Sequence, residues 1–261
     1  MLNKKECAGP VSGPGEVGNN RMGEQSLLAG TKGAWFGHWR HVFKLDPDKD
    51  ISDHELEALC LSGTDAILLG GSSGVTFGNT IELMSRVRRY EVDCALEVST
   101  LDGAVPGFDG YFIPVVLNTD KPEWIIGNQL RGLQEYGAFI PWETTAGQGY
   151  IILNEASTAA RLTSANANMD EAQVIAHVAM ADKLLRLPVI YMEYSGRFGD
   201  MDLLKRVRPL VSQARLFYGG GIDNAEKAAL AARYAHTVVV GNVVYSDLEA
   251  ALSTVPAVKQ G

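Results

Sequence analysis

The sequence predicts an α/β protein built as a (β/α)8 barrel, and three observations lead to that fold. Eight short runs rich in β-branched and apolar residues recur from Trp39 onward. Segments with the hydrophobic period of a helix separate most of these runs, and glycine or polar residues follow nearly every one. Eight units in this length favour a closed barrel over the structural alternative, a doubly wound open sheet.

The expected strands are continuous apolar runs, as is typical of parallel strands buried on both faces. They are residues 39–45, 65–70, 94–98, 111–117, 149–153, 188–194, 215–219 and 237–241. The expected helices are residues 53–61, 76–89, 122–136, 169–186, 199–212, 223–234 and 245–254. Residues 99–110, between the third and fourth strands, contain three glycines and a proline and are too broken for a regular helix.

Residues 1–34 are rich in glycine and show no sustained period, so we expect a flexible leader ahead of one barrel domain at 35–261. Within the leader, Gly13, Gly15 and Gly18 match the G-x-G-x-x-G pattern of dinucleotide-binding loops. That pattern works only between a strand and a helix, and neither is expected here. We therefore interpret the match as coincidental.

Composition excludes several classes of function. The chain has 31 acidic and 23 basic residues, a net charge of −8, and no basic run that would predict nucleic-acid binding. Its three cysteines, Cys7, Cys60 and Cys94, are odd in number and show no metal-binding spacing. They favour a reducing cytoplasm. The sequence has no apolar stretch long enough for a membrane helix and no signal peptide, so we expect a cytoplasmic protein.

Glycines after the last two expected strands predict a phosphate site. The turns are Gly219-Gly220-Gly221 and Gly241-Asn242, and a barrel brings both to the mouth where active sites are built. Glycine lets the backbone approach an anion, and N–H groups and a helix N-terminus supply partial positive charge. The alternative is that these glycines only permit tight turns.

A second glycine pattern, at Gly70, Ser72 and Gly74, matches the G-x-S-x-G turn of α/β hydrolases. A catalytic triad also needs a histidine at the same strand ends. His177 falls within an expected helix, and His236 precedes the last strand. We therefore disfavour a hydrolase and expect Ser72 to shape the turn or to bind a magnesium ion through its hydroxyl.

Charged side chains on the first strand are expected to point into the mouth. Lys44 and Asp46 alternate along that strand and share a face. The alternative is a buried Lys–Asp ion pair, which without further compensation costs several kcal/mol per ion. We therefore expect Lys44 to face a phosphate and Asp46 to face a divalent cation.

The sixth strand is expected to carry a base. Tyr191, Glu193 and Ser195 share one face, whereas Met192 and Tyr194 share the other. A phosphate in the mouth would repel a carboxylate that served only as filler. Glu193 therefore suits a general base, or an acceptor that orients the hydroxyls of a polyol.

Six segments together resemble the PcrB and geranylgeranylglyceryl phosphate synthase family over residues 38–258. They are HVFKLDP (41–47), SGTDAILLGGSSGVT (62–76), VPGFDGYFIPVVLN (105–118), YMEYSG (191–196), LFYGGGI (216–222) and VVVGNVVY (238–245). The resemblance implies a modified (β/α)8 TIM barrel in which irregular chain replaces the third helix. It also implies Mg²⁺-dependent transfer of a polyprenyl group from its diphosphate to sn-glycerol 1-phosphate, which forms an ether-linked lipid precursor. A homodimer with transient contact to a membrane surface is implied as well.

The same resemblance assigns residues to the site. The glycerol phosphate site comprises Lys44, Tyr191, Met192, Glu193, Tyr194, Ser195, Gly196, Gly221, Gly241 and Asn242, while Asp46 and Ser72 hold Mg²⁺. Glu193 accepts the proton of the attacking hydroxyl, helped by Tyr191. Ser73 departs from the family, which often has an acidic residue there. Tyr136 stands where archaeal relatives have tryptophan at the end of the prenyl groove, so the implied donor is heptaprenyl (C35) rather than geranylgeranyl (C20) diphosphate.

Two other functions stay open. A phosphosugar-type barrel lyase or isomerase would use Lys44 to form a Schiff base with a carbonyl substrate. A non-catalytic phosphate-binding protein would use the same glycine turns without any reaction.

Overall fold

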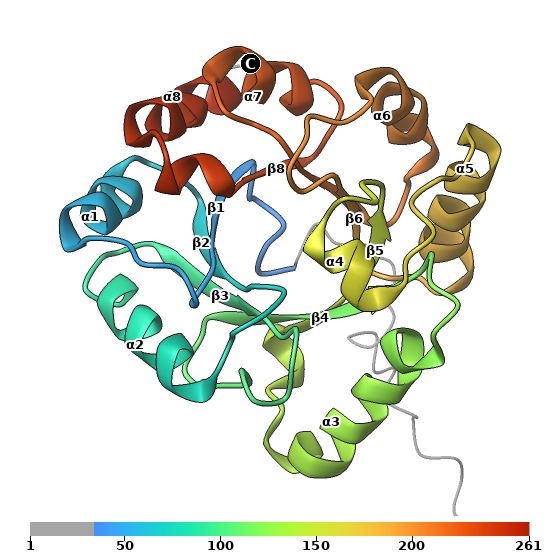
Figure 1. Ribbon diagram of the computed structural model, residues 1–261, viewed down its shortest axis with the longest axis horizontal. Helices are drawn as coiled ribbons and strands as arrows, with labels where there is room; N and C mark the ends of the chain where they lie inside the picture. The colour runs from blue at the N-terminus through green and yellow to red at the C-terminus, as the bar shows by residue number, and fades with distance from the viewer. Residues whose placement is uncertain (1–33, 261) are drawn as a thin grey trace, which may run out of the picture.

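The computed structural model describes residues 34–260. All eight strands are parallel, and β8 pairs with β1, so the sheet closes into a barrel (Figure 1). The strands are β1 (His41–Leu45), β2 (Ala66–Leu69), β3 (Asp93–Glu97), β4 (Gly110–Val116), β5 (Thr145–Ile152), β6 (Val189–Glu193), β7 (Arg215–Gly219) and β8 (Thr237–Val240). The predicted (β/α)8 barrel is thus confirmed, and the open sheet is excluded.

Helices form a ring around the strands (Figure 1). They are α1 (Asp53–Leu61), α2 (Phe77–Val87), α3 (Asn128–Tyr136), α4 (Thr158–Thr163), α5 (Glu171–Ala179), α6 (Met201–Val207), α7 (Ala225–Ala232) and α8 (Leu248–Lys259). Two π-helical turns adjoin them: η2 (Glu123–Gly127) leads into α3, and η5 (Met180–Leu184) continues α5. Between β3 and β4 the chain runs through residues 98–109, which form turns and bends.

Helix starts follow from local sequence. Ser52 caps α1 in a capping box: its hydroxyl accepts from the backbone N–H of Glu55, whose carboxylate accepts from the N–H of Ser52 at 2.9 Å. Thr76 and Asp170 cap α2 and α5 in the same reciprocal way. Each box satisfies two backbone donors that a helix start would otherwise leave without partners.

Several elements differ from those predicted. Helix α4 was not expected, because six residues are too few to show a hydrophobic period, although Ser157 caps it. Strand β5 begins at Thr145, before the predicted start at residue 149. A Cβ on Gly149 would lie 2.9 Å from a methyl carbon of Leu187, so this glycine lets the outer layer approach the strand. Helix α8 runs to Lys259 with Pro256 inside it, while its buried valines hold it against the barrel.

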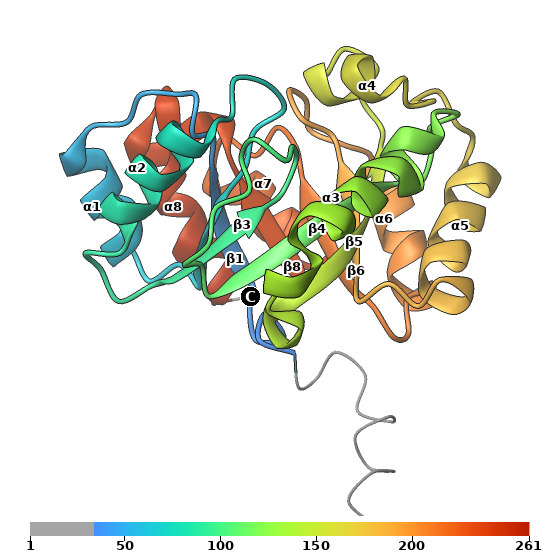
Figure 2. The same ribbon diagram turned by 90° about the horizontal axis from the view of Figure 1, so that it is seen from below.

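Two layers of apolar side chains make the core. Those pointing into the barrel include Phe112 and Phe217, and those on the opposite faces pack beneath the helices. Trp35, Phe36 and Trp39 close the N-terminal end of the barrel, with the ring centroid of Trp35 4.9 Å from that of Phe112. This end lies at the bottom in Figure 2, opposite α4. An aromatic plug at one end leaves the other end for the site.

The expected leader, with Gly13, Gly15, Gly18 and Cys7, lies outside the described residues. Within residues 34–260, no helix is both long enough and apolar enough to cross a membrane.

Candidate active site

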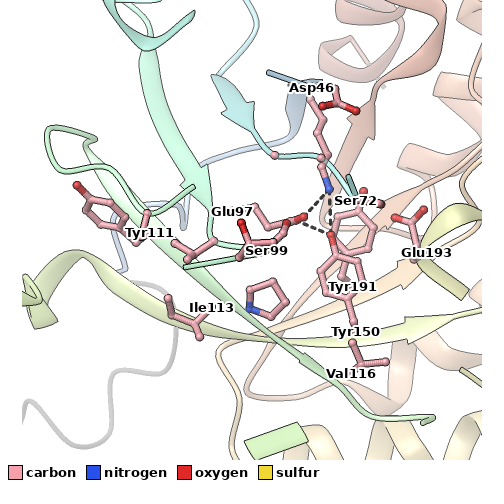
Figure 3. Close-up of a pocket in the computed structure, with 18 of the residues that line it drawn as sticks. Asp46, Ser72, Glu97, Ser99, Tyr111, Ile113, Val116, Tyr150, Tyr191 and Glu193 are labelled. Atoms are coloured by element: carbon pink, nitrogen blue, oxygen red, sulfur yellow. Dashed lines mark hydrogen bonds and ion pairs between the residues drawn. The ribbon is translucent and has the colours of Figure 1, made fainter. Parts of the chain in front are cut away.

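A cavity of about 1580 Å³ opens at the carboxyl ends of the strands. Its lining is polar around the ends of β1, β2 and β6 to β8, and apolar between residues 98–108, β4 and α3. Figure 3 shows this division: Asp46, Ser72 and Glu193 lie to one side of Glu97, and Tyr111 and Ile113 lie to the other. One cavity therefore joins a polar mouth to an apolar groove.

The polar mouth exists because three strands continue into glycine at the inward-facing position. Along each of these strands, the last inward-facing side chain before the glycine is apolar, as Phe217 is on β7. The next inward-facing positions, two residues later, are Gly70, Gly219 and Gly241. A Cβ on Gly219 would lie 2.1 Å from the hydroxyl oxygen of Tyr191. The uppermost layer of the barrel is thus left open for a ligand.

The turns after β6 and β7 have a backbone that requires glycine. Gly196, Gly220 and Gly221 have φ angles of +90°, +148° and +57°, which residues with a Cβ rarely adopt. A Cβ on Gly221 would lie 2.0 Å from the backbone nitrogen of Phe198, so the turn after β7 packs directly on the loop after β6. Both turns line the cavity, and so does Asn242 at the start of η7 (Asn242–Tyr245).

Lys44 lies in the mouth as expected, but its partner was not foreseen. Its ammonium donates to the Glu97 carboxylate at 2.6 Å and to the Tyr150 hydroxyl at 3.2 Å. Among the described residues Lys44 forms no ion pair with Asp46, so that alternative is wrong, whereas the approach of Lys44 to a phosphate stays a prediction. Burial tends to lower the pKa of Lys44, but the carboxylates of Glu97 and Glu193 raise it above the usual value. A Schiff base requires a neutral amine, so this environment disfavours the lyase alternative.

Glu193 has the environment of a base. Its side chain is 6% exposed, and one carboxylate oxygen accepts from the Ser195 N–H at 2.7 Å. Burial raises the pKa of Glu193, whereas the Lys44 ammonium, the Ser195 N–H and the Tyr191 hydroxyl act to lower it. Burial also keeps the pKa of Tyr191 well above its usual value, so this phenol acts as a hydrogen-bond donor.

Met192 and Tyr194 do not present their side chains to the cavity. Both are buried among the residues between the strands and the helices, because the alternation of β6 turns them outward. If these two residues take part in the glycerol phosphate site, as the resemblance implies, they do so through their backbone and not through their side chains. Only their backbone remains near the mouth, and Gly220 packs against the backbone of Tyr194.

Asp46 and Ser72 come together at the mouth and fit a magnesium ion by chemistry. A Cβ on Gly71 would lie 2.2 Å from a carboxylate oxygen of Asp46, so the loop holding Ser72 leaves room for that carboxylate. One Asp46 oxygen accepts from the Asp48 N–H at 3.1 Å, and both Asp46 and Ser72 line the cavity. Carboxylate and hydroxyl oxygens are donors that Mg²⁺ accepts.

The apolar groove is formed largely by α3 and the segment after β3. Helix α3 has no buried residue, and its Leu133 and Tyr136 line the cavity. Across the groove, a Cβ on Gly132 would lie 3.2 Å from a methyl carbon of Leu101. Apolar side chains left open to a cavity predict an apolar ligand. Tyr136, the expected prenyl-groove residue, and Gly132 both line this groove.

A model described as the PcrB family matches residues 35–259. The chain belongs to the PcrB family. Within the PcrB family, the heptaprenylglyceryl phosphate synthase of Brevibacillus brevis is 55% identical over 221 residues, which cover 85% of this chain and 96% of the relative. The heptaprenylglyceryl phosphate synthase of Bacillus cereus is 52% identical over the same shares.

Among solved structures, the chain is similar to (S)-3-O-geranylgeranylglyceryl phosphate synthase from Thermoplasma acidophilum in complex with sn-glycerol-1-phosphate. The TM-score is 0.76 at 21% identity, covering 91% of this chain and 98% of that one. At this identity the likeness shows that the PcrB-family chain shares the fold.

Other features of the mouth bear on the alternatives. None of the five histidines, all within the described residues, lines the cavity, so the hydrolase triad is absent from this PcrB-family site.

Glu97 and Tyr150 were missed as site residues, although Glu97 stands at the end of an expected strand. Lys49 was also missed; its ammonium lies 4.8 Å from the Tyr245 ring centroid at the cavity rim.

Proposed function

We propose that this PcrB-family chain is a heptaprenylglyceryl phosphate synthase, which moves a heptaprenyl group from its diphosphate to sn-glycerol 1-phosphate. The observation that carries the proposal is the single cavity that joins a glycine-rich polar mouth to an apolar groove. A phosphorylated alcohol and a long hydrocarbon must meet in such a site. Identity of 55% to a relative named for this product supports the C35 donor.

In the proposed reaction, the glycine turns and Asn242 bind the phosphate of sn-glycerol 1-phosphate through backbone N–H groups and an amide. Glu193 accepts the proton of the attacking primary hydroxyl, while Tyr191 donates to the Glu193 carboxylate and orients it. The hydroxyl oxygen bonds to the allylic carbon, and the bond from that carbon to the diphosphate breaks with its electron pair leaving on the diphosphate. Asp46 and Ser72 would hold Mg²⁺, which supplies charge neutralisation for the departing diphosphate.

The prenyl tail is assigned to the apolar groove. Residues 98–109 stand where the third helix of a regular barrel would lie, and we propose that this replacement opens the barrel wall to the tail. Leu101 and Val105 from this segment line the groove opposite α3. Tyr136 is proposed to limit tail length at the end of the groove.

The assembly and location are proposed from surface features. Phe139 and Trp142 are 83% and 58% exposed beside the groove, which suits burial in a homodimer or brief contact with a membrane surface during donor uptake. Light scattering tests the dimer, and co-sedimentation with vesicles tests the membrane contact. The free buried thiols of Cys60 and Cys94 suit a reducing cytoplasm.

The direct test incubates purified protein with Mg²⁺, labelled sn-glycerol 1-phosphate and each of a panel of C15 to C35 diphosphates. We expect a butanol-extractable product, most abundant with the C35 donor, and none when Mg²⁺ is chelated. Absence of product with every donor would favour a phosphate-binding protein. A covalent adduct on Lys44 after borohydride treatment with a carbonyl substrate would favour the lyase.

A further inference from the structure

One ammonium and two carboxylates share the buried floor of the cavity. Lys44 on β1 faces Glu97 on β3 and Glu193 on β6, whose side chains are 5% and 6% exposed. Within residues 34–260, Glu97 is the only ion-pair partner of Lys44. Three carboxylates act on the ammonium, those of Glu97, Glu193 and Asp46, and the ammonium pairs with Glu97.

Tyr150 contacts both members of the Lys44–Glu97 pair. Its hydroxyl donates to the second carboxylate oxygen of Glu97 and accepts from the Lys44 ammonium, as the dashed lines in Figure 3 mark. Its ring stacks on Tyr191 with centroids 4.6 Å apart and planes 9° apart, which holds the hydroxyl in place. Both oxygens of Glu97 are thus bonded, and two of the three ammonium hydrogens are used.

Glu193 is bonded differently, although it lines the same cavity. Its carboxylate accepts from the Ser195 N–H at 2.7 Å, and the Tyr191 hydroxyl helps to lower its pKa; both groups are uncharged. The ionisable groups that act on it are Lys44 from β1, Glu97 from β3, Tyr150 from β5, Tyr191 from its own strand and Tyr218 from β7. Lys44 is the only cation among these groups.

We propose that Glu97 is a positioning residue that holds the Lys44 ammonium and thereby leaves the Glu193 carboxylate free of an ion pair, able to take the proton of the acceptor hydroxyl. This inference rests on the proposed function, in which Glu193 is the base. An ion pair stabilises the charged form of a carboxylate and weakens it as a base. Without the charge of Glu97, the carboxylates that still act on Lys44 are those of Glu193 and Asp46, and Glu193 acts on it more strongly.

The test is Glu97→Gln, which removes the charge and retains the shape and a hydrogen-bond acceptor. We expect the single-turnover rate to fall about three- to tenfold, because Glu193 becomes a weaker base. The acidic limb of the pH–rate profile moves to lower pH, since both the loss of the Glu97 charge and the approach of Lys44 lower the pKa of Glu193. Binding of sn-glycerol 1-phosphate, measured by calorimetry, does not weaken.

Three further variants serve as a control, a charge-retaining comparison and a substitute test. Glu91→Gln changes an exposed glutamate before β3 and is expected to leave rate and pH profile unchanged. Glu97→Asp keeps the charge and is expected to return the acidic limb toward its wild-type position. If Glu97→Gln does not fold, as judged by thermal melting, Tyr150→Phe removes the clamp but keeps the ring stack and is expected to shift the limb in the same direction by less.

An acidic limb that stays at the wild-type position in folded Glu97→Gln would overturn the inference. So would weakened sn-glycerol 1-phosphate binding with an unmoved limb, because Glu97 would then act on binding alone. A wild-type protein that makes no product would instead overturn the proposed function, so the two failures are distinct.

Discussion

The hydroxyl of Tyr191 occupies the space that a side chain on Gly219 would need. A Cβ on Gly219 would lie 2.1 Å from that oxygen, whereas ordinary contacts are longer than 3.4 Å. The glycine after β7 thus serves the tyrosine on β6 as well as the turn that follows. The backbone of β7 and a side chain of β6 therefore pack closely beside Glu193, the proposed base.

Gly219→Ala should therefore disable the site without unfolding the barrel. The added methyl displaces the Tyr191 hydroxyl, which we propose orients Glu193, and loss of one such positioned group costs about tenfold or more in rate. Gly137→Ala is the matched control, because a Cβ there meets nothing within 4 Å. Steady-state kinetics measures the rates, and thermal melting checks that both variants fold. Equal rates for the two variants would show that the Tyr191–Gly219 contact does not affect turnover.

Tail length should respond to groove width at two positions. Gly132→Trp places a large side chain against Leu101, and Tyr136→Trp enlarges the residue proposed to end the groove. Both should shift the preferred donor from C35 toward shorter chains, because overpacked side chains leave no room for the distal isoprene units. Mass spectrometry of products from mixed donors measures the shift. If only Gly132→Trp acts, the assignment of length control to Tyr136 is wrong.

The pH dependence of turnover should report Glu193. Burial raises its pKa above the usual glutamate value of about 4.3, and the base works only when deprotonated. The value of kcat/KM should therefore fall as the pH drops through this raised pKa, at a higher pH than an ordinary glutamate would give. Glu193→Gln should abolish turnover and keep affinity for sn-glycerol 1-phosphate. Retained turnover in Glu193→Gln would remove Glu193 as the base.

Magnesium affinity should depend on Asp46. Asp46→Asn replaces a charged oxygen donor by a neutral one, so the Mg²⁺ concentration for half-maximal rate should rise about tenfold or more. Asp50→Asn, an exposed neighbour, is the control. Titration of activity with MgCl₂ gives both values. An unchanged Mg²⁺ requirement in Asp46→Asn would place the metal elsewhere.

Away from the cavity, Asp182 should control stability. Its buried carboxylate accepts from the N–H groups of Ser212, Gln213 and Ala214 at 3.1, 2.9 and 2.8 Å. Asp182→Ala leaves these donors unpaired and should lower the free energy of unfolding by about 3 kcal/mol in urea titration. Burial alone would raise the pKa of Asp182, but the Lys183 ammonium and the three N–H donors lower it below the usual aspartate value.

The sign of the pH effect follows from that depressed pKa. Stability from Asp182 is fully present above the unfolded aspartate pKa of about 3.9 and is lost as pH falls through the lower folded value. The difference in unfolding free energy between wild type and Asp182→Ala should therefore shrink only in strong acid. A difference that shrinks already near neutral pH would argue against the charged carboxylate as its source.

Particular residues show how far the sequence leads. Gly219, Gly241 and Asn242 were predictable at the rim, because parallel strands end at one edge and glycine runs there are visible in the sequence. The Lys44–Glu97 pair was not, because it joins β1 to β3 across the barrel interior, and strand order alone does not say which inward side chains meet. Helix α4 was missed because its six residues are too few to show a period.

Similarly, alternation along β6 predicted the outward direction of Met192 and Tyr194, yet the resemblance placed both in the substrate site as part of a continuous run. The structure separates side chain from backbone at these positions. Tyr150 and Lys49 carried no motif at all. Their positions depend on packing between distant strands and loops, which needs coordinates.

Competition between donors of different length tests the proposed C35 specificity. The wild-type protein is given Mg²⁺, sn-glycerol 1-phosphate and an equimolar mixture of C15, C20, C25, C30 and C35 diphosphates, and the extracted lipid is identified by mass spectrometry. We expect heptaprenylglyceryl phosphate as the main product. A main product carrying a C20 chain, or no prenylglyceryl phosphate, would contradict it.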